Sequence, residues 1–199
     1  MQKPKLTIEE AKNQLREYFL SLGPNTPLDE LNELVDDFTI DKFNKKEIIL
    51  EAGDFRDCVY FICIGIVRIY YVKEEKEITT WFIKENMVFA ATYSLLSGEQ
   101  NFSNYEALED CIVLKIKYAQ LEAYYKKYHS LEHLGRKMVE SYFSNFMKRS
   151  FDVMFLSAEE RYQMFVNQHP DLLNRVPLRY VASYLGLTQE TLSRLRSKH

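Results

Sequence analysis

The chain changes its pattern abruptly near Tyr118, and this change limits the fold more than any other feature of the sequence. Before it, over residues 38–117, short runs rich in β-branched and aromatic residues alternate with turn signals such as Ala52-Gly53-Asp54. Strands this short and this regularly spaced are typical of a small barrel or jelly roll. The expected strands are residues 38–43, 47–50, 59–63, 66–72, 78–83 and 107–116.

Helical patterns lie on both sides of the strand segment. A Ser or Thr followed three residues later by an acid signals a helix start, and this signal predicts starts at Thr7, Thr26 and Ser157. After the strands we expect a short helix over residues 119–128 and a long one over residues 131–156. The second N-terminal helix, residues 28–37, is expected to place four residues on one face: Leu28, Leu31, Leu34 and Val35.

The long helix is predicted to carry the dimer contact. It contains no Pro and only one Gly, Gly135, and its larger side chains recur at steps of three and four residues. A stripe of this length either covers the roll or packs against its copy in a dimer, and we expect a parallel homodimer. The stripe comprises Leu131, Leu134, Met138, Tyr142, Phe146 and Arg149. The fold class is thus α+β, with a β-roll domain (residues 1–130), a dimerisation helix (131–156) and an all-α C-terminal domain (157–199).

The C-terminal stretch has the spacing of a helix-turn-helix. In Ala182-x3-Gly186-x5-Leu192, Ala permits close approach of two helices, Gly makes the turn and Leu fills the joint. Pro177 is suited to the start of the first helix, and Thr188 can cap the second. The second helix is expected to point four polar side chains outward, where a Glu can accept from cytosine N4 and an Arg can bind guanine O6 and N7. These base-reading candidates are Gln189, Glu190, Ser193 and Arg194.

The distribution of charge supports a nucleic-acid partner for the same stretch. The last 28 residues hold five basic residues and one acid, which gives them a net charge of +4. Because the whole chain has a net charge of −3, the other residues together carry −7. A basic segment on an acidic body is expected when one small region meets phosphates. A solvated surface helix, or an ordinary helical hairpin, remains an alternative. The expected phosphate contacts are Arg175, Arg179, Thr188, Arg196 and Lys198.

From about residue 28 to the C-terminus the chain resembles the Crp/Fnr family of bacterial transcription regulators. The roll carries Glu51-Ala52-Gly53-Asp54 and Cys63-Ile64-Gly65-Ile66-Val67-Arg68-Ile69-Tyr70, and Glu190-Thr191-Leu192-Ser193-Arg194 matches the family's Glu-x-x-Ser-Arg in full. The resemblance implies that Glu190 and Arg194 read a C·G and a G·C pair, with Ser193 beside them. Together with the stripe on the long helix, this motif predicts a homodimer on double-stranded DNA with an inverted-repeat site, in the cytoplasm, with RNA polymerase as a further partner. Gln189 stands where members of the cyclic-AMP type often carry Arg.

The resemblance also shows where an effector would bind, and the sequence departs from the cyclic-nucleotide pattern there. Such members use a Gly-Glu and an Arg-Ser pair, at which this chain has Ala90-Ala91 and Asn101-Phe102. The long helix contributes Phe146-Met147 where hydroxyl residues would approach the base. Residues 85–110 include no Lys or Arg, so a phosphodiester would lack a cationic partner. We predict that cyclic AMP does not control this protein.

Other cofactors of the family have no better support. Iron–sulfur members place a cysteine cluster near the N-terminus, whereas the first 57 residues here contain no Cys. The three thiols, Cys58, Cys63 and Cys111, are one short of the four that a cluster takes, and Cys63 is expected in the core. His129 and His133 share a helix face without a visible third ligand. We expect no metal, haem or iron–sulfur cluster, and the effector is unknown.

An enzyme and a protein-binding module are the two alternatives to a regulator. An enzyme is not expected, because the sequence has no Gly-rich phosphate loop, nucleophile elbow or His-Glu-x-x-His run. The stronger alternative is a sensory or protein-binding module with a degenerate helix-turn-helix. This sequence stops at His199, directly after the expected recognition helix, whereas many relatives continue there into a β-wing. No apolar run reaches the roughly 18 residues of a membrane span, the N-terminus lacks a secretory signal, and the odd number of Cys fits a reducing compartment.

Overall fold

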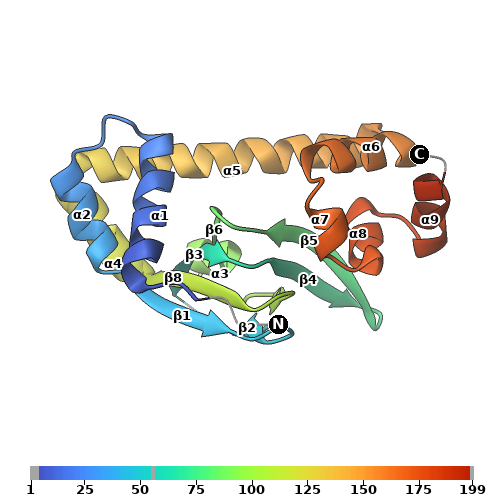
Figure 1. Cartoon of the computed structure of the whole chain (residues 1–199), viewed down its shortest axis with the longest axis horizontal. Coiled ribbons are helices and arrows are strands. Elements are labelled where there is room, and N and C mark those ends of the chain that lie inside the picture. The colour runs from blue at the N-terminus through green and yellow to red at the C-terminus, as the bar shows by residue number, and fades with distance from the viewer. Residues whose placement is uncertain (1–4, 55–56, 198–199) are drawn as a thin grey trace. The chain divides into compact units, whose positions relative to one another are not determined.

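A computed structural model describes residues 5–54 and 57–197 and divides the chain into two compact units. The first unit comprises Met1–Ile69 and Phe82–Glu140, and the second comprises Tyr70–Trp81 and Ser141–His199. The long helix α5 (His129–Phe155) contributes to both of them (Figure 1). The segment 70–81, called the hairpin segment below, is the outer part of a β-hairpin that groups with the C-terminal helices.

Two four-stranded sheets form the predicted roll. One sheet has the order β1-β8-β3-β6, and the other has the order β2-β7-β4-β5. In the first sheet β8 pairs antiparallel with both β1 and β3, and the register sets Phe61 opposite Leu114 in the core. The strands are β1 (Thr39–Phe43), β2 (Ile48–Leu50), β3 (Cys58–Ile64), β4 (Val67–Lys73), β5 (Lys76–Ile83), β6 (Val88–Ala90), β7 (Asn104–Ala107) and β8 (Cys111–Lys117). This arrangement confirms the α+β class with a β-roll.

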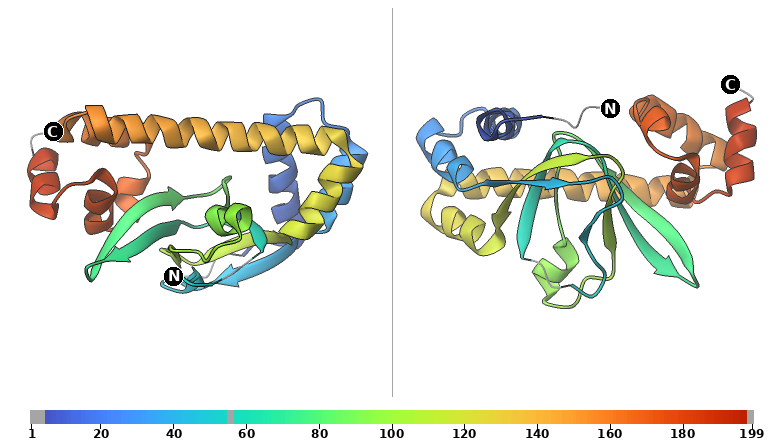
Figure 2. Two further views of the ribbon diagram at one scale, coloured as in Figure 1. Left: turned by 180° about the vertical axis from the view of Figure 1, so that it is seen from behind. Right: turned by 60° about the horizontal axis from the view of Figure 1, so that its bottom comes forward.

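Helices α1 (Ile8–Leu22), α2 (Leu28–Asp36) and α4 (Tyr118–Lys127) gather beside β1 and β8 in the first unit (Figures 1 and 2). The predicted capping box at Thr7 is present, because its hydroxyl accepts from the Glu10 N–H while the Glu10 carboxylate accepts from the Thr7 N–H. On the buried face of α1, Tyr18 lies with its ring 5.4 Å from the ring of Phe61 in β3. Apolar burial against the roll therefore holds this helix in place.

The start of α2 differs from the prediction. Thr26 does not cap this helix, because its hydroxyl donates to the Gly23 carbonyl at 2.8 Å and closes the preceding turn instead. Pro27 occupies the N-cap position without a side-chain hydrogen bond. Leu28 was expected on the buried face and is exposed, since it stands in the first turn; Leu31 and Leu34 are buried as predicted. The sequence does not show whether a threonine hydroxyl will cap the following helix or bond to a carbonyl of the preceding turn.

Several short elements were missed or joined in the sequence analysis. The predicted strand over residues 107–116 is wrong as one element, because the chain turns between β7 and β8. In this turn Leu108 N–H donates to the Ile66 carbonyl, and the Asp110 carboxylate accepts from Lys45 N–H at 2.9 Å. Strand β6, helix α3 (Thr92–Ser97) and helix α7 (Leu172–Arg175) were not predicted. With three to six residues each, they are too short to show a periodic pattern.

The second unit contains the C-terminal helices α6 (Ala158–Gln168), α7, α8 (Leu178–Leu185) and α9 (Gln189–Ser197), shown in orange and red in Figure 2. The predicted capping box at Ser157 is present and opens α6. Helix α6 packs on α8 and α9, where it buries Tyr162 and Phe165. Among the described residues, no helix is both long enough and apolar enough to cross a membrane.

Candidate DNA-binding interface and effector pocket

The turn between α8 and α9 has the geometry that the sequence predicts. Gly186 ends α8 in the left-handed region, with φ of 68°, and Leu187 N–H donates to the Ala182 carbonyl at 2.9 Å. A Cβ added at Gly186 would meet nothing within 4 Å. Glycine is therefore favoured by the backbone conformation and not by lack of space.

The joint between the two helices is apolar and closed. Val181, Ala182 and Leu185 from α8 and Leu192 from α9 are buried, as expected for a helix-turn-helix. Leu178, at the start of α8, is only half-buried. The sequence analysis missed Tyr180, which is buried although its neighbour Arg179 is exposed.

The N-terminus of α9 is organised by Thr188. Its hydroxyl accepts from Thr191 N–H at 3.2 Å, which is the predicted cap. Hydrogen bonds from its own backbone and from Thr188 keep the pKa of Glu190 below its ordinary value, and the positive charge of Arg194 adds to this effect. The Glu190 side chain is therefore a charged hydrogen-bond acceptor at neutral pH.

All four base-reading candidates lie exposed on α9. Gln189 and Glu190 stand in the first turn, and Ser193 and Arg194 follow one turn later. Glu190 and Arg194 are four residues apart, so both project from one side of the helix. The Arg194 guanidinium makes one long hydrogen bond, 3.4 Å, to the Thr191 hydroxyl. This face offers a carboxylate acceptor and a guanidinium donor, two groups that can read base edges in a major groove.

The expected phosphate contacts are less uniform. Arg179 and Arg196 are exposed, and the Arg179 guanidinium donates to the Tyr180 hydroxyl at 2.8 Å. Arg175 is half-buried, and its guanidinium lies 3.8 Å from the Asp171 carboxylate. Thr188 is exposed but engaged in the cap. Lys198 lies outside the described residues.

In the roll, the residues of the predicted effector pocket do not form one polar cluster. Asn101 is buried, and its side-chain amide donates to the Ser103 carbonyl at 2.5 Å and to the Glu51 carbonyl at 3.3 Å. Phe102 is exposed and packs edge-on against Tyr93. Ala91 is buried at the start of α3, and Ala90 ends β6. Phe146 and Met147 belong to the other compact unit.

The roll contains one buried cation that the sequence analysis missed. Arg68 in β4 has no exposed surface, and its guanidinium lies 3.2 Å from the Glu106 carboxylate in β7. Strands β4 and β7 are neighbours in the sheet although 38 residues separate the two side chains in sequence. A search of residues 85–110 alone could not find this pair.

Metal-ligating residues do not cluster in the part of the chain that the structure describes: no three His, Cys, Asp or Glu side chains lie together as a metal site would require. His129 lies 3.3 Å from the Glu132 carboxylate, and His133 contacts Arg136. Burial raises the pKa of both Cys63 and Cys111 to about 12, so both are neutral thiols at pH 7. Cys63 lies in the core, as predicted.

The apolar residues that α5 exposes are mostly not those of the stripe predicted from the sequence. Leu131 and Leu134 are buried within their own unit, and Arg149 packs with its guanidinium 3.6 Å from the centre of the Tyr184 ring. A different row stands exposed at steps of three and four residues. This row, called the apolar row below, comprises Val139, Phe143, Phe146, Met147, Phe151, Met154 and Phe155. So continuous an exposed apolar surface is typical of a protein–protein interface.

Comparison with known proteins finds relatives for most of this chain. Residues 40–128 match the family of cyclic nucleotide-binding domains. The anaerobic regulatory protein of Haemophilus influenzae is 24% identical over 184 residues, which cover 84% of this chain and 68% of the relative. The fumarate and nitrate reduction regulatory protein of Vibrio cholerae is 26% identical over 185 residues, with 84% and 70% covered.

Two solved structures have the same fold. FixK2 from Bradyrhizobium japonicum superposes with a TM-score of 0.71 at 23% identity, over 81% of this chain and 83% of that chain. A Eubacterium rectale protein described as a transcriptional regulator of the Crp/Fnr family gives a TM-score of 0.67 at 16% identity, over 90% and 86% of the two chains.

The fold and the sites define a regulator that joins a roll of the cyclic nucleotide-binding type to a C-terminal helix-turn-helix. The chain is similar to transcription regulators of the Crp/Fnr type, in agreement with the resemblance that its motifs carry. The prediction that it is a regulator and not an enzyme is confirmed by the same relatives.

Proposed function

We propose that this protein is a cytoplasmic homodimer that binds double-stranded DNA at an inverted repeat and regulates transcription there, with RNA polymerase as a further partner. The observation that carries the proposal is the exposed pair Glu190 and Arg194 on α9. The carboxylate would accept from cytosine N4, and the guanidinium would donate to guanine O6 and N7. Gln189 and Ser193 complete the reading face, while Arg175, Arg179, Thr188, Arg196 and Lys198 supply phosphate contacts.

The apolar row on α5 supports the dimer. Phe143 and Phe146 are 62% and 60% exposed, and burying such rings against a second copy stabilises an interface by about 1.5–3 kcal/mol each. A two-fold axis along paired α5 helices would set two recognition helices roughly 34 Å apart on one face of the DNA. Paired half-sites in opposite orientation follow from that symmetry.

We further propose that cyclic AMP and cyclic GMP do not act through the roll. Asn101 stands where the resemblance places the phosphate-binding Arg, and its amide is bound to backbone carbonyls. The buried Arg68 is paired with Glu106. A phosphodiester in this roll would have to compete with that carboxylate for its counter-charge.

The test is a selection of bound sequences from random duplex DNA with the full chain, followed by sedimentation of the protein with the selected duplex. The expected result is an inverted repeat whose half-sites contain C·G and G·C pairs, bound by two protein chains. Selection without enrichment would support the alternative of a module with a degenerate helix-turn-helix. A single chain on the selected duplex would contradict the dimer.

A further inference from the structure

The hairpin segment is bound to the first helix of the helix-turn-helix through one side chain. Ser183 in α8 accepts a hydrogen bond from Thr79 N–H at 2.9 Å, and its hydroxyl donates to the Glu77 carbonyl at 3.2 Å. These two backbone groups belong to β5, which lies at the edge of its sheet. The hydroxyl thus occupies edge positions that a further strand would use. We call this pair of hydrogen bonds the Ser183 contact.

The next residue of α8 strengthens the same attachment. The Tyr184 ring lies edge-on to Trp81 of the hairpin segment, with 6.5 Å between ring centres. The Arg149 guanidinium stacks on Tyr184, donates to its carbonyl at 2.7 Å and lies 5.8 Å from the Trp81 ring. Two consecutive residues of α8 are therefore tied to the hairpin segment and to α5, all within the second unit.

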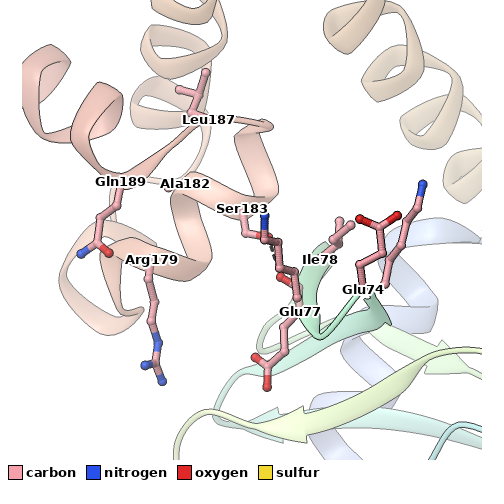
Figure 3. A pocket seen from close by; sticks show the side chains of 10 residues that line it. Glu74, Glu77, Ile78, Arg179, Ala182, Ser183, Leu187 and Gln189 are labelled. Carbon is pink, nitrogen blue, oxygen red and sulfur yellow. Dashed lines mark hydrogen bonds between the residues drawn. The ribbon is translucent and has the colours of Figure 1, made fainter.

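A cavity of about 430 Å³ lies beside this attachment, and it contains a base-reading residue. Gln189 and Arg179 line it from the helix-turn-helix, and Glu74 and Glu77 line it from the hairpin segment (Figure 3). The tip of the hairpin carries three acids, Glu74, Glu75 and Glu77, and two lysines, Lys73 and Lys76. Gln189, in the first turn of the proposed recognition helix α9, thus lines the same cavity as a hairpin tip of net negative charge.

We propose that the hairpin segment restrains the DNA-binding helices, so that the Ser183 contact must open, or the tip must move aside, before α9 enters the major groove. The inference rests on the DNA-binding function proposed above and adds its regulation. DNA phosphates brought to Gln189 would meet the Glu74 and Glu77 carboxylates, and like charges at short range oppose binding. Closed molecules lower the apparent affinity for DNA, because only the open fraction of the protein can bind.

Two variants remove the restraint by different routes. Ser183→Ala deletes both hydrogen bonds and leaves α9 unchanged, with Ser144→Ala on the exposed side of α5 as the matched control. Glu74→Gln combined with Glu77→Gln removes charge from the cavity lining, with Glu75→Gln as the control because Glu75 is on the same tip but does not line the cavity. Both restraint variants should bind the selected duplex about three- to tenfold more tightly, the range expected from one or two ordinary hydrogen bonds. The controls should stay within twofold of the parent.

Trp81, the only tryptophan of the chain, gives a second readout that does not depend on DNA. Ser183→Ala in the full chain should increase quenching of its fluorescence by acrylamide, whereas Ser144→Ala should not. Weaker or unchanged DNA affinity of Ser183→Ala would overturn the inference, as would unchanged quenching. If neither parent nor variant binds any duplex, the proposed function fails and this inference with it; unchanged affinity in a chain that does bind overturns the inference alone.

Discussion

The helix-turn-helix and the roll use their polar side chains in opposite ways. On α9, Glu190 and Arg194 are held by short-range hydrogen bonds near the surface and remain exposed. In the roll, Asn101 and Arg68 are buried and bonded to other parts of the same domain. Polar groups directed to solvent are available to a partner, whereas buried polar groups must be satisfied internally. The candidate base-reading groups on α9 are therefore available to a partner, whereas Asn101 and Arg68 are used in contacts within the roll.

The polar side chains of the two regions should also differ in how much they contribute to the free energy of unfolding. The recognition face contributes little to folding, because exposed side chains rarely change the free energy of unfolding by more than about 0.5 kcal/mol. The buried amide of Asn101 joins loops 50 residues apart in sequence, so its loss would leave backbone groups unsatisfied. Mutations in the two regions should therefore separate binding from stability.

The largest effect is expected at the apolar row on α5. Phe143→Glu with Phe146→Glu should dissociate the dimer and lower DNA affinity about 100-fold or more, because two linked half-site contacts become independent. Sedimentation equilibrium and DNA titration measure both changes. Asn145→Glu, an exposed position between the two, should leave the dimer intact. A dimer that survives the double substitution would place the interface elsewhere.

The next effect tests the recognition face itself. Arg194→Ala should weaken binding of the selected duplex by about 1–3 kcal/mol and relax the preference at one G·C pair in each half-site, with no change in thermal stability. Arg196→Ala should instead weaken selected and random duplexes alike and reduce the salt dependence by about one unit per half-site. Titrations at several salt concentrations distinguish the two. Equal losses on both duplexes for Arg194→Ala would reassign it to phosphate contact.

The matching substitution in the roll should show the reverse pattern. Asn101→Ala removes donors to the Glu51 and Ser103 carbonyls and should lower the free energy of unfolding by about 1–2 kcal/mol. The sequence preference on DNA should not change. Gln100→Ala, at the exposed neighbouring position, is the control and should be neutral. Urea denaturation measures the difference, and an equally stable Asn101→Ala would mean that the amide is dispensable.

The last prediction is that cyclic nucleotides have no measurable effect, because they do not bind. Titration calorimetry with cyclic AMP or cyclic GMP at up to millimolar concentration should show no binding to the full chain, because the one buried cation, Arg68, of the described part of the roll is paired with Glu106. Micromolar affinity would contradict the comparison between the two regions. It would mean that a cation from elsewhere reaches the pocket.

Local sequence patterns determined much of this protein. The caps at Thr7, Ser157 and Thr188 and the left-handed turn at Gly186 follow from interactions within three or four residues, which are readable along the chain. The cap, the turn and the apolar joint of the helix-turn-helix could therefore be predicted, although the buried Tyr180 could not. The alternation of strands in the roll was also readable, except that β6 was missed and that β7 and β8 were joined into one strand.

Only the tertiary structure decided the contacts between distant segments. The Arg68–Glu106 pair spans 38 residues and the Ser183–Thr79 hydrogen bond spans 104, and no local periodicity encodes either partner. The same holds for α5, where packing buried Leu131 and Leu134 and left Phe143 and Phe146 exposed. A helical period states which residues share a face, but the neighbours that fold against the helix decide which face is covered.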